Sequence, residues 1–188
     1  TVYCPPKAFH TGLVMTENTV LQLGNPLLRQ IATPVTVFNS PEFLDCLSSM
    51  QTLMESGNGV GIAAPQIGVA MQIVIVASRP TNRYPDAPEM PATILCNPQL
   101  EILDPTLIKG WEGCLSVPGI RALVPRYQAI RVRFQDREGK SQQIDLKDFP
   151  ARVFQHEFDH LQGLVYLDRI ESSRDIVAES EYLKLIAH

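Results

Sequence analysis

The spacing of apolar residues predicts a helix in the first third of the chain. Apolar side chains recur at helical spacing at Phe43, Leu47, Met50 and Met54. Ser40 and Pro41 precede them, as is typical of a helix N-terminus, and Gly57 supplies a stop. We therefore predict a helix that packs this stripe of side chains on the core.

The pattern then changes to that of strands. Residues 73–77 are uninterruptedly apolar, which predicts a buried strand, and strand-like segments follow at residues 93–96 and 107–111. In residues 130–135 apolar side chains alternate with Arg and Gln, as in a half-exposed strand. A turn at residues 136–139 leads to a further strand at residues 142–146, so these two strands are predicted to form a hairpin.

The remaining segments complete the predicted architecture. Residues 59–68 read as a loop of small residues, and residues 78–91, with four prolines, as an exposed excursion. A helix is expected to begin near residues 149–150, and a last polar helix, capped near Ser172 or Ser173, to cover residues 175–186. Strands without regular βαβ alternation predict a single-domain α+β fold, with mainly antiparallel sheets packed around the helix that begins near residue 149.

Composition describes an ordinary globular protein. The chain has 188 residues, of which 45% are hydrophobic and 19% charged. Its net charge of −4 gives no electrostatic reason to expect direct nucleic-acid binding. The longest apolar run is too short to cross a bilayer, and no secretory signal is visible. Four scattered cysteines predict reduced thiols and a cytosol-like compartment.

Residues 155–161 (QHEFDHL) carry the strongest chemical signal. On a helix, His156 and His160 stand about 40° apart around the axis and about 6 Å apart along it. Two imidazoles at this spacing can bind one metal ion, with Glu157 beside them to handle a proton. The alternative is an ordinary helix that carries two histidines. A helical wheel argues against that alternative. It places an apolar face, formed by Phe154, Phe158 and Leu161, roughly opposite the two histidines.

Two histidines leave a metal ion short of protein ligands, so a third ligand is needed. The metzincin pattern is excluded, because Tyr166 stands where its third histidine would be. Glu179 or Glu181 could serve, as a downstream Glu does in thermolysin-like enzymes, although little chain remains for such a protease. The remaining candidate is Cys114, in a segment followed by turn-forming Pro and Gly. A lone Cys is otherwise a small buried hydrophobe.

Three segments of the chain resemble the motifs of peptide deformylase, in that family's order. They are residues 59–66 (GVGIAAPQ), 112–116 (EGCLS) and 155–160 (QHEFDH). The similarity covers roughly residues 20–170. Ile62 replaces the Leu usual in the first motif, which is an isosteric change. On this resemblance, residues 1–18 are expected to be an N-terminal extension or processed end, and residues 19–188 the catalytic domain.

The resemblance implies a metal centre. It makes Cys114, His156 and His160 the ligands of one divalent ion, with water in the fourth position. It implies Fe²⁺ as the physiological ion, with Zn²⁺, Ni²⁺ or Co²⁺ in preparations, whereas a Cys-His-His set favours zinc on chemical grounds.

The resemblance also implies the reaction, which is removal of the formyl group from N-formylmethionyl nascent peptides with release of formate. Glu157 is expected to transfer the proton of the attacking water to the leaving amine. Gln66 and the backbone N–H of Leu115 are expected to hold the oxyanion.

Substrate binding is expected to involve an apolar pocket for the Met side chain and contacts to the peptide. The residues implied are Val60, Gly61, Gly113, Leu115, Arg121 and Val153. Arg121 would lie near the substrate backbone, with a solvated surface Arg as the alternative. Glu112 and Arg126 are expected to pair behind the Cys ligand.

The setting of the protein follows from the resemblance alone. A transient contact with the ribosome is implied, in the bacterial cytoplasm or in an organelle. Two other functions stay open, namely a zinc-dependent endopeptidase and a structural metal-binding domain. The structural domain would have no need of Glu157 or Gln66.

Overall fold

The strands of the computed structural model, which describes residues 19–81 and 84–187, form one antiparallel sheet in the order β1-β2-β3-β4-β5, with β6 also paired to β4. Residues 1–18, the predicted extension, lie outside the described residues, and so does Cys4. The strands are β1 (Gly61–Ala63), β2 (Ile73–Ser78), β3 (Met90–Cys114), β4 (Val117–Gln135), β5 (Ser141–Lys147) and β6 (Ile176–Ala178). The predicted antiparallel α+β class is confirmed, with one sheet in place of several.

Three α-helices and four short 3-10 helices accompany the sheet in the described part of the chain. They are η1 (Pro26–Arg29), α1 (Pro41–Ser56), η2 (Ala64–Ile67), α2 (Asp148–Leu161), η3 (Tyr166–Arg169), η4 (Ser173–Asp175) and α3 (Glu179–Ile186). The predicted first helix is confirmed as α1, with Ser40 accepting a hydrogen bond from Phe43 N. Among the described residues, no helix has both the length and the apolar character needed to cross a membrane.

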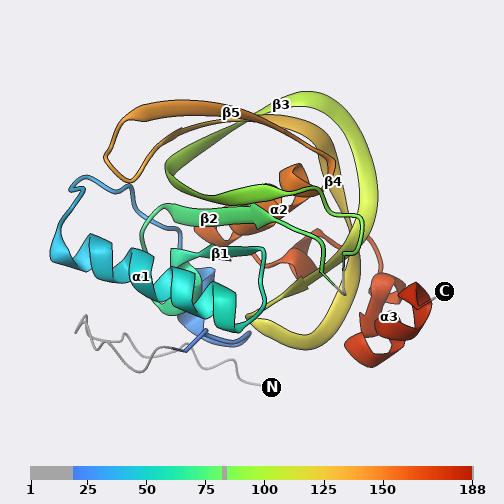
Figure 1. The fold of residues 1–188 in the computed structure, drawn as a ribbon. Helices are drawn as coiled ribbons and strands as arrows, with labels where there is room; N and C mark the ends of the chain where they lie inside the picture. The colour runs from blue at the N-terminus through green and yellow to red at the C-terminus, as the bar shows by residue number, and fades with distance from the viewer. Residues whose placement is uncertain (1–18, 82–83, 188) are drawn as a thin grey trace, which may run out of the picture.

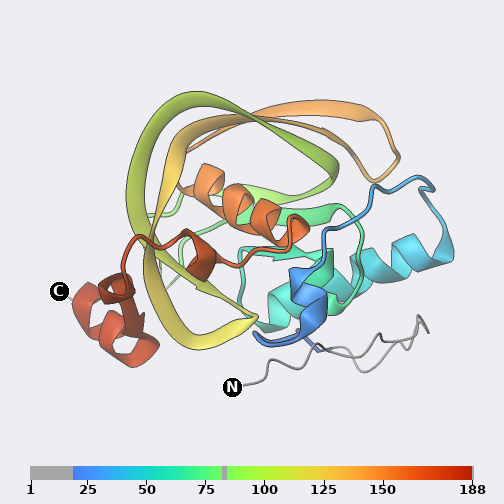
Figure 2. The ribbon, with the colours of Figure 1, turned by 180° about the vertical axis from the view of Figure 1, so that it is seen from behind.

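Strand β2 lies between two helices, which explains its continuous apolar sequence. All six of its residues are buried. Ile73 and Ile75 join the core cluster under α1, whereas Val74 and Val76 join the cluster under α2. Figures 1 and 2, seen from opposite sides, place α1 and α2 on opposite sides of β1 and β2. The apolar face of α2, with Phe154 and Leu161, therefore packs on the sheet.

Two long strands, β3 and β4, arch over the molecule (Figure 1). The two predicted segments at residues 93–96 and 107–111 are parts of the single strand β3. Its register against β4 shifts at several points, including those flanking Pro98 and Pro105. Because proline cannot donate to the ladder, it interrupts the alternating pattern without ending the strand. The predicted hairpin joins β4 to β5.

The predictions for two loop segments are corrected. Residues 59–68 contain β1 and η2 in place of a plain loop, because Ile62 is fully buried and pairs with Ile75 of β2. The segment at residues 78–91 is not wholly exposed, since Ala87 is buried and the Tyr84 ring lies 4.6 Å from that of Phe149.

The predicted last helix begins later than expected. Ser172 caps the short η4 through a hydrogen bond from Arg174 N. The β-branched residues Ile176 and Val177 then pair with β4 as β6, and the helix α3 begins only at Glu179. This short strand brings the C-terminal part of the chain to the edge of the cavity described next.

Candidate metal centre

The second and third predicted motifs lie next to each other in the structure, one at the end of β3 and the other on α2. Cys114 is the last residue of β3, and His156 and His160 lie on the buried α2. One ligand atom from each of these three residues lies within 4.8 Å of the other two. The only His, Cys, Asp or Glu residues that the described structure groups in this way are these three, so neither Glu179 nor Glu181 joins them.

The three side chains fit a divalent metal ion. Cys114 Sγ lies 3.3 Å from His160 Nε2. A tetrahedral ion with bonds of about 2.3 Å to sulfur and about 2.1 Å to nitrogen places its ligand atoms about 3.5 Å apart. Burial, His156 and nearby arginines hold the pKa of His160 well below its ordinary value, so this imidazole is neutral, as a metal ligand must be. Three protein ligands correspond to a catalytic site, because structural zinc sites take four.

A buried carboxylate orients His156. Glu112 Oε2 lies 2.9 Å from His156 Nδ1, which leaves Nε2 as the nitrogen available to an ion. The Glu112 carboxylate also accepts hydrogen bonds from Arg126 and Arg152, and Arg126 pairs in addition with Asp159. Burial alone would raise the pKa of Glu112, but Arg126 and His156 hold it well below its usual value. The predicted pairing of Glu112 with Arg126 is confirmed.

The carboxylate of Glu157 lies buried beside the three ligand candidates. Burial raises its pKa to about 7, which suits a group that takes and returns protons near neutral pH. Its Oε2 atom is buried without a hydrogen-bond partner in the part of the chain that the structure describes. A Cβ added at Gly61 would lie 2.4 Å from Glu157 Oε1, so the carboxylate rests against the glycine backbone.

The side chain of Gln66 in η2 contacts the ligand candidate Cys114. Its Nε2 lies 3.3 Å from Cys114 Sγ and 3.2 Å from Ser116 Oγ. Its Oε1 accepts a hydrogen bond from the Ala63 N–H at 2.8 Å, which fixes the orientation of the amide. The three predicted motifs thus converge within one site.

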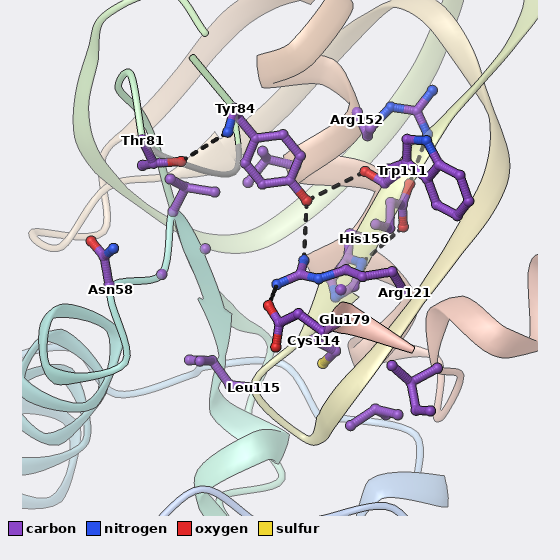
Figure 3. Close-up of a pocket in the computed structure, with 18 of the residues that line it drawn as sticks. Asn58, Thr81, Tyr84, Trp111, Cys114, Leu115, Arg121, Arg152, His156 and Glu179 are labelled. Atoms are coloured by element: carbon purple, nitrogen blue, oxygen red, sulfur yellow. Dashed lines mark hydrogen bonds and ion pairs between the residues drawn. The ribbon is translucent and has the colours of Figure 1, made fainter. Parts of the chain in front are cut away.

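A cavity of about 200 Å³ opens beside this group. All the residues expected to contact a substrate line it, namely Val60, Gly61, Gly113, Leu115, Arg121 and Val153. Small and apolar residues 59–61 form part of its wall, and the polar side chains of Tyr84, Arg121 and Glu179 form another part (Figure 3).

Arg121 is not a solvated surface residue, so that alternative is wrong. Its residue exposure is 6%. Arg121 Nη2 lies 2.6 Å from Glu179 Oε1, and Nη1 donates to Tyr84 Oη at 3.4 Å. The Tyr84 hydroxyl donates to the backbone oxygen of Trp111 at 3.3 Å. Figure 3 shows the guanidinium between Tyr84 and Glu179.

Several residues that line the cavity are not predicted from the sequence, among them Tyr84, Glu179 and Arg152. Tyr84 lies in the proline-rich segment, where no periodicity marked it. Glu179 was weighed only as a metal ligand. Arg152 could have been found, because it stands one helical turn before His156 on the same face. It donates to Glu112 and to backbone oxygens of both long strands.

Comparison with known proteins agrees with the motifs. A sequence model of the polypeptide deformylase family matches residues 17–175. Peptide deformylase 2 of Nostoc sp. is 48% identical over 89% of this chain and 93% of its own length, and peptide deformylase 1 of Bordetella pertussis is 48% identical over 81% and 87%. The Met-Ala-Ser-bound crystal structure of a class I type b peptide deformylase from Acinetobacter baumannii has a TM-score of 0.79 and 40% identity, covering 84% of this chain and 100% of that one.

Proposed function

The chain belongs to the peptide deformylase family, and from this premise we propose that Cys114, His156 and His160 hold a divalent metal ion at which an N-formylmethionyl peptide is deformylated. The chain is a hydrolase that removes the formyl group from nascent peptides. The single observation that carries the assignment of residues is the grouping of the three ligand atoms within 4.8 Å of one another, beside the buried carboxylate of Glu157.

When bound, the ion supplies a Lewis acid that polarises a carbonyl and makes water more acidic. We propose Fe²⁺ as the physiological ion, as the family resemblance implies, while the Cys-His-His set also suits Zn²⁺, Ni²⁺ or Co²⁺. Turnover measured with each ion in turn, under anaerobic conditions for iron, tests this choice. A higher turnover number with zinc than with iron would contradict it.

Glu157 is the proton-transfer group. Its carboxylate takes a proton from the water that adds to the formyl carbon. The bond between that carbon and the peptide nitrogen then breaks, and Glu157 returns the proton to the leaving amine. The products are formate and a peptide with a free amino terminus. A pKa of about 7 allows both transfers near neutral pH.

Gln66 and Leu115 stabilise the charge that develops on the formyl oxygen. The Gln66 amide faces Cys114, and its orientation is fixed by the Ala63 N–H. In the reaction, one N–H of Gln66 and the backbone N–H of Leu115 donate to this oxygen. Loss of one such donor costs about 10²–10³ in rate, so we expect Gln66→Ala to be severely impaired but folded.

The methionine side chain is held by the apolar part of the cavity. Val60, Leu115 and Val153 line it, and Gly61 and Gly113 leave room for the peptide. An unbranched, polarisable thioether suits such a surface. Arg121 lies toward the following residues of the peptide. The Met-Ala-Ser ligand of the Acinetobacter baumannii structure is of the peptide class that this arrangement would accept.

Formate release from formyl-Met-Ala-Ser tests the proposal. Metal-loaded wild type is expected to release formate, and Glu157→Ala to lose at least about 10²-fold in kcat while it keeps its metal. Glu171→Ala, at an exposed ion pair with Lys109, is the matched control and should match wild type. Absence of formate with the metal-replete wild type would overturn the function.

We propose four further features of the protein from its sequence and its family resemblance. They are a domain boundary between residues 18 and 19, the role of the helix bearing His156 as the centre of the fold, a transient ribosome contact and a cytoplasmic location. The bacterial source of the similar curated proteins supports the location, and an organelle stays open. The net charge of −4 offers no electrostatic support for the ribosome contact.

A further inference from the structure

A segment at the C-terminal end of the chain contributes to the cavity although it lies beyond the family match, which ends at residue 175. Strand β6 pairs with β4 so that Val177 stands opposite Arg121. The next element, α3, begins at Glu179, which lines the cavity. The Tyr182 ring of α3 lies 5.4 Å from that of Trp111, which also lines the cavity.

The charge of Arg121 is neutralised by this segment. Its guanidinium is buried and pairs with Glu179 at 2.6 Å, and it lies 5.7 Å from the centre of the Tyr182 ring. Burial alone would lower the pKa of Arg121, but the hydrogen bond to Glu179 raises it, so the guanidinium stays charged beside the Glu179 carboxylate. Arg121 Nε is buried without a hydrogen-bond partner among the described residues. The pair is therefore electrically neutral and keeps an unused donor.

The guanidinium lies close to the metal centre. A Cβ added at Gly113 would be 2.2 Å from Arg121 Cζ, so the guanidinium rests against the residue that precedes Cys114. An extended peptide advances at most about 3.5 Å per residue. With the formyl group at the metal centre, the group that follows the second residue therefore lies within about 7 Å of it. Arg121 lines the same cavity and contacts the residue next to Cys114, so we infer that this group comes near the guanidinium. In a nascent chain that group is a peptide carbonyl, whereas in a formyl dipeptide it is a free carboxylate.

A peptide carbonyl and a free carboxylate interact differently with the guanidinium of Arg121. An unneutralised buried guanidinium would bind a carboxylate as an ion pair, in which both partners are charged, whereas a neutral carbonyl adds no opposite charge to the hydrogen bond. A guanidinium already paired with a carboxylate attracts a second anion only weakly, because that anion is also repelled by Glu179. The guanidinium can still donate a hydrogen bond to a neutral carbonyl.

We propose that Glu179 is a specificity-determining residue. By pairing with Arg121, it makes the site select a peptide carbonyl over a free carboxylate at the position two residues after the formyl group. This inference rests on the proposed function of the site. The C-terminal segment would thus contribute to substrate selection through Glu179, which lines the cavity.

The test compares formyl-Met-Ala as the free acid with formyl-Met-Ala amide, using metal-loaded enzyme and formate release. Wild type is expected to give kcat/KM values for the acid that do not exceed those for the amide. In Glu179→Gln, the ratio of acid to amide should rise about tenfold, mainly through KM, because the carboxylate gains a charge-assisted hydrogen bond. Glu181→Gln is the matched control, since Glu181 lies on the same helix and pairs with the exposed Lys184.

Two further variants separate specificity from folding. Glu179→Asp keeps the charge and should keep the wild-type ratio. In the double variant Arg121→Met, Glu179→Gln the rise should vanish, because no guanidinium is left to bind the carboxylate. Formate release from both peptides with an unchanged ratio in Glu179→Gln would overturn this inference alone. No formate from either peptide with wild type would overturn the proposed function and this inference with it.

Discussion

Nδ1 of His156 lies 2.9 Å from Oε2 of Glu112, and this contact joins a ligand candidate to a buried cluster of arginines. Because Nδ1 is engaged, the other ring nitrogen is held toward Cys114 and His160. Arg126 and Arg152 both donate to Glu112, so its position is fixed from two sides. The orientation of the imidazole is thus set by residues outside the metal-binding group.

We predict that Glu112→Gln weakens metal binding. The amide keeps the shape of the side chain but removes the charge that orients and polarises His156, and such changes cost about 10–100-fold in metal affinity. Competition with a chromogenic chelator measures this affinity directly. The exposed Glu138→Gln is the control and should bind metal as wild type does. An unchanged affinity in Glu112→Gln would show that the contact has no such role.

Gly61→Ala should inactivate the enzyme without unfolding it. The new methyl group would stand 2.4 Å from Glu157 Oε1, so the carboxylate would have to move from its position. Displacing a proton-transfer group costs roughly 10² or more in kcat. In Gly59→Ala, the nearest contact is 3.3 Å, to the Met54 oxygen, and we expect activity close to wild type. Equal activities in the two variants would contradict this reading.

Arg152→Met should lower stability. The guanidinium of Arg152 donates to Glu112 and to the backbone oxygens of Ile108, Gly110 and Val124. Removing it leaves the buried Glu112 carboxylate and the backbone oxygen of the buried Val124 with one donor fewer, which costs about 2–4 kcal/mol in the free energy of unfolding. Urea titration of the metal-free protein measures the loss. Arg131→Met, at a more exposed pair with Asp145, should change stability far less, and the reverse order would contradict the account.

The described cysteines should differ in reactivity. Burial raises the pKa of Cys46 and of Cys96 to about 12, so these thiols stay protonated and inaccessible to iodoacetamide at pH 8. Cys114 is partly exposed at the cavity and should be alkylated in the metal-free protein but protected by bound metal. Peptide mapping by mass spectrometry reads each site. Alkylation of Cys114 at the same rate with and without metal would argue against its role as a ligand.

Local patterns predicted much of the fold. The helix from Pro41 to Ser56 was predicted correctly because its cap, its stripe and its stop all lie within the sequence of the element itself. The continuity of β3 was missed, because Pro98 and Pro105 interrupt the alternation while the strand accommodates them as register shifts. Strand β6 was missed because three residues carry no period, and their conformation is set by pairing with β4.

The candidate site likewise contains residues that the sequence predicts and residues that it does not. Its motif residues could be found from spacing and resemblance. The structure groups Cys114 with His156 and His160, and it places Gln66 and Glu157 in the lining of the adjoining cavity. Tyr84 and Glu179 could not be placed, because their positions depend on contacts with Trp111 and Arg121, which are far away in the sequence. The burial of Arg121 likewise follows from the partner that the C-terminal segment brings to it.

The central claim is that Cys114 shares one metal ion with His156 and His160. X-ray absorption spectroscopy of the zinc-loaded protein tests it most directly. We expect one sulfur at about 2.3 Å, two imidazole nitrogens at about 2.1 Å and one further light atom from solvent. We also expect the sulfur contribution to disappear in Cys114→Ser. A first shell without sulfur in the wild-type protein, or one filled by a fourth protein side chain, would contradict the account.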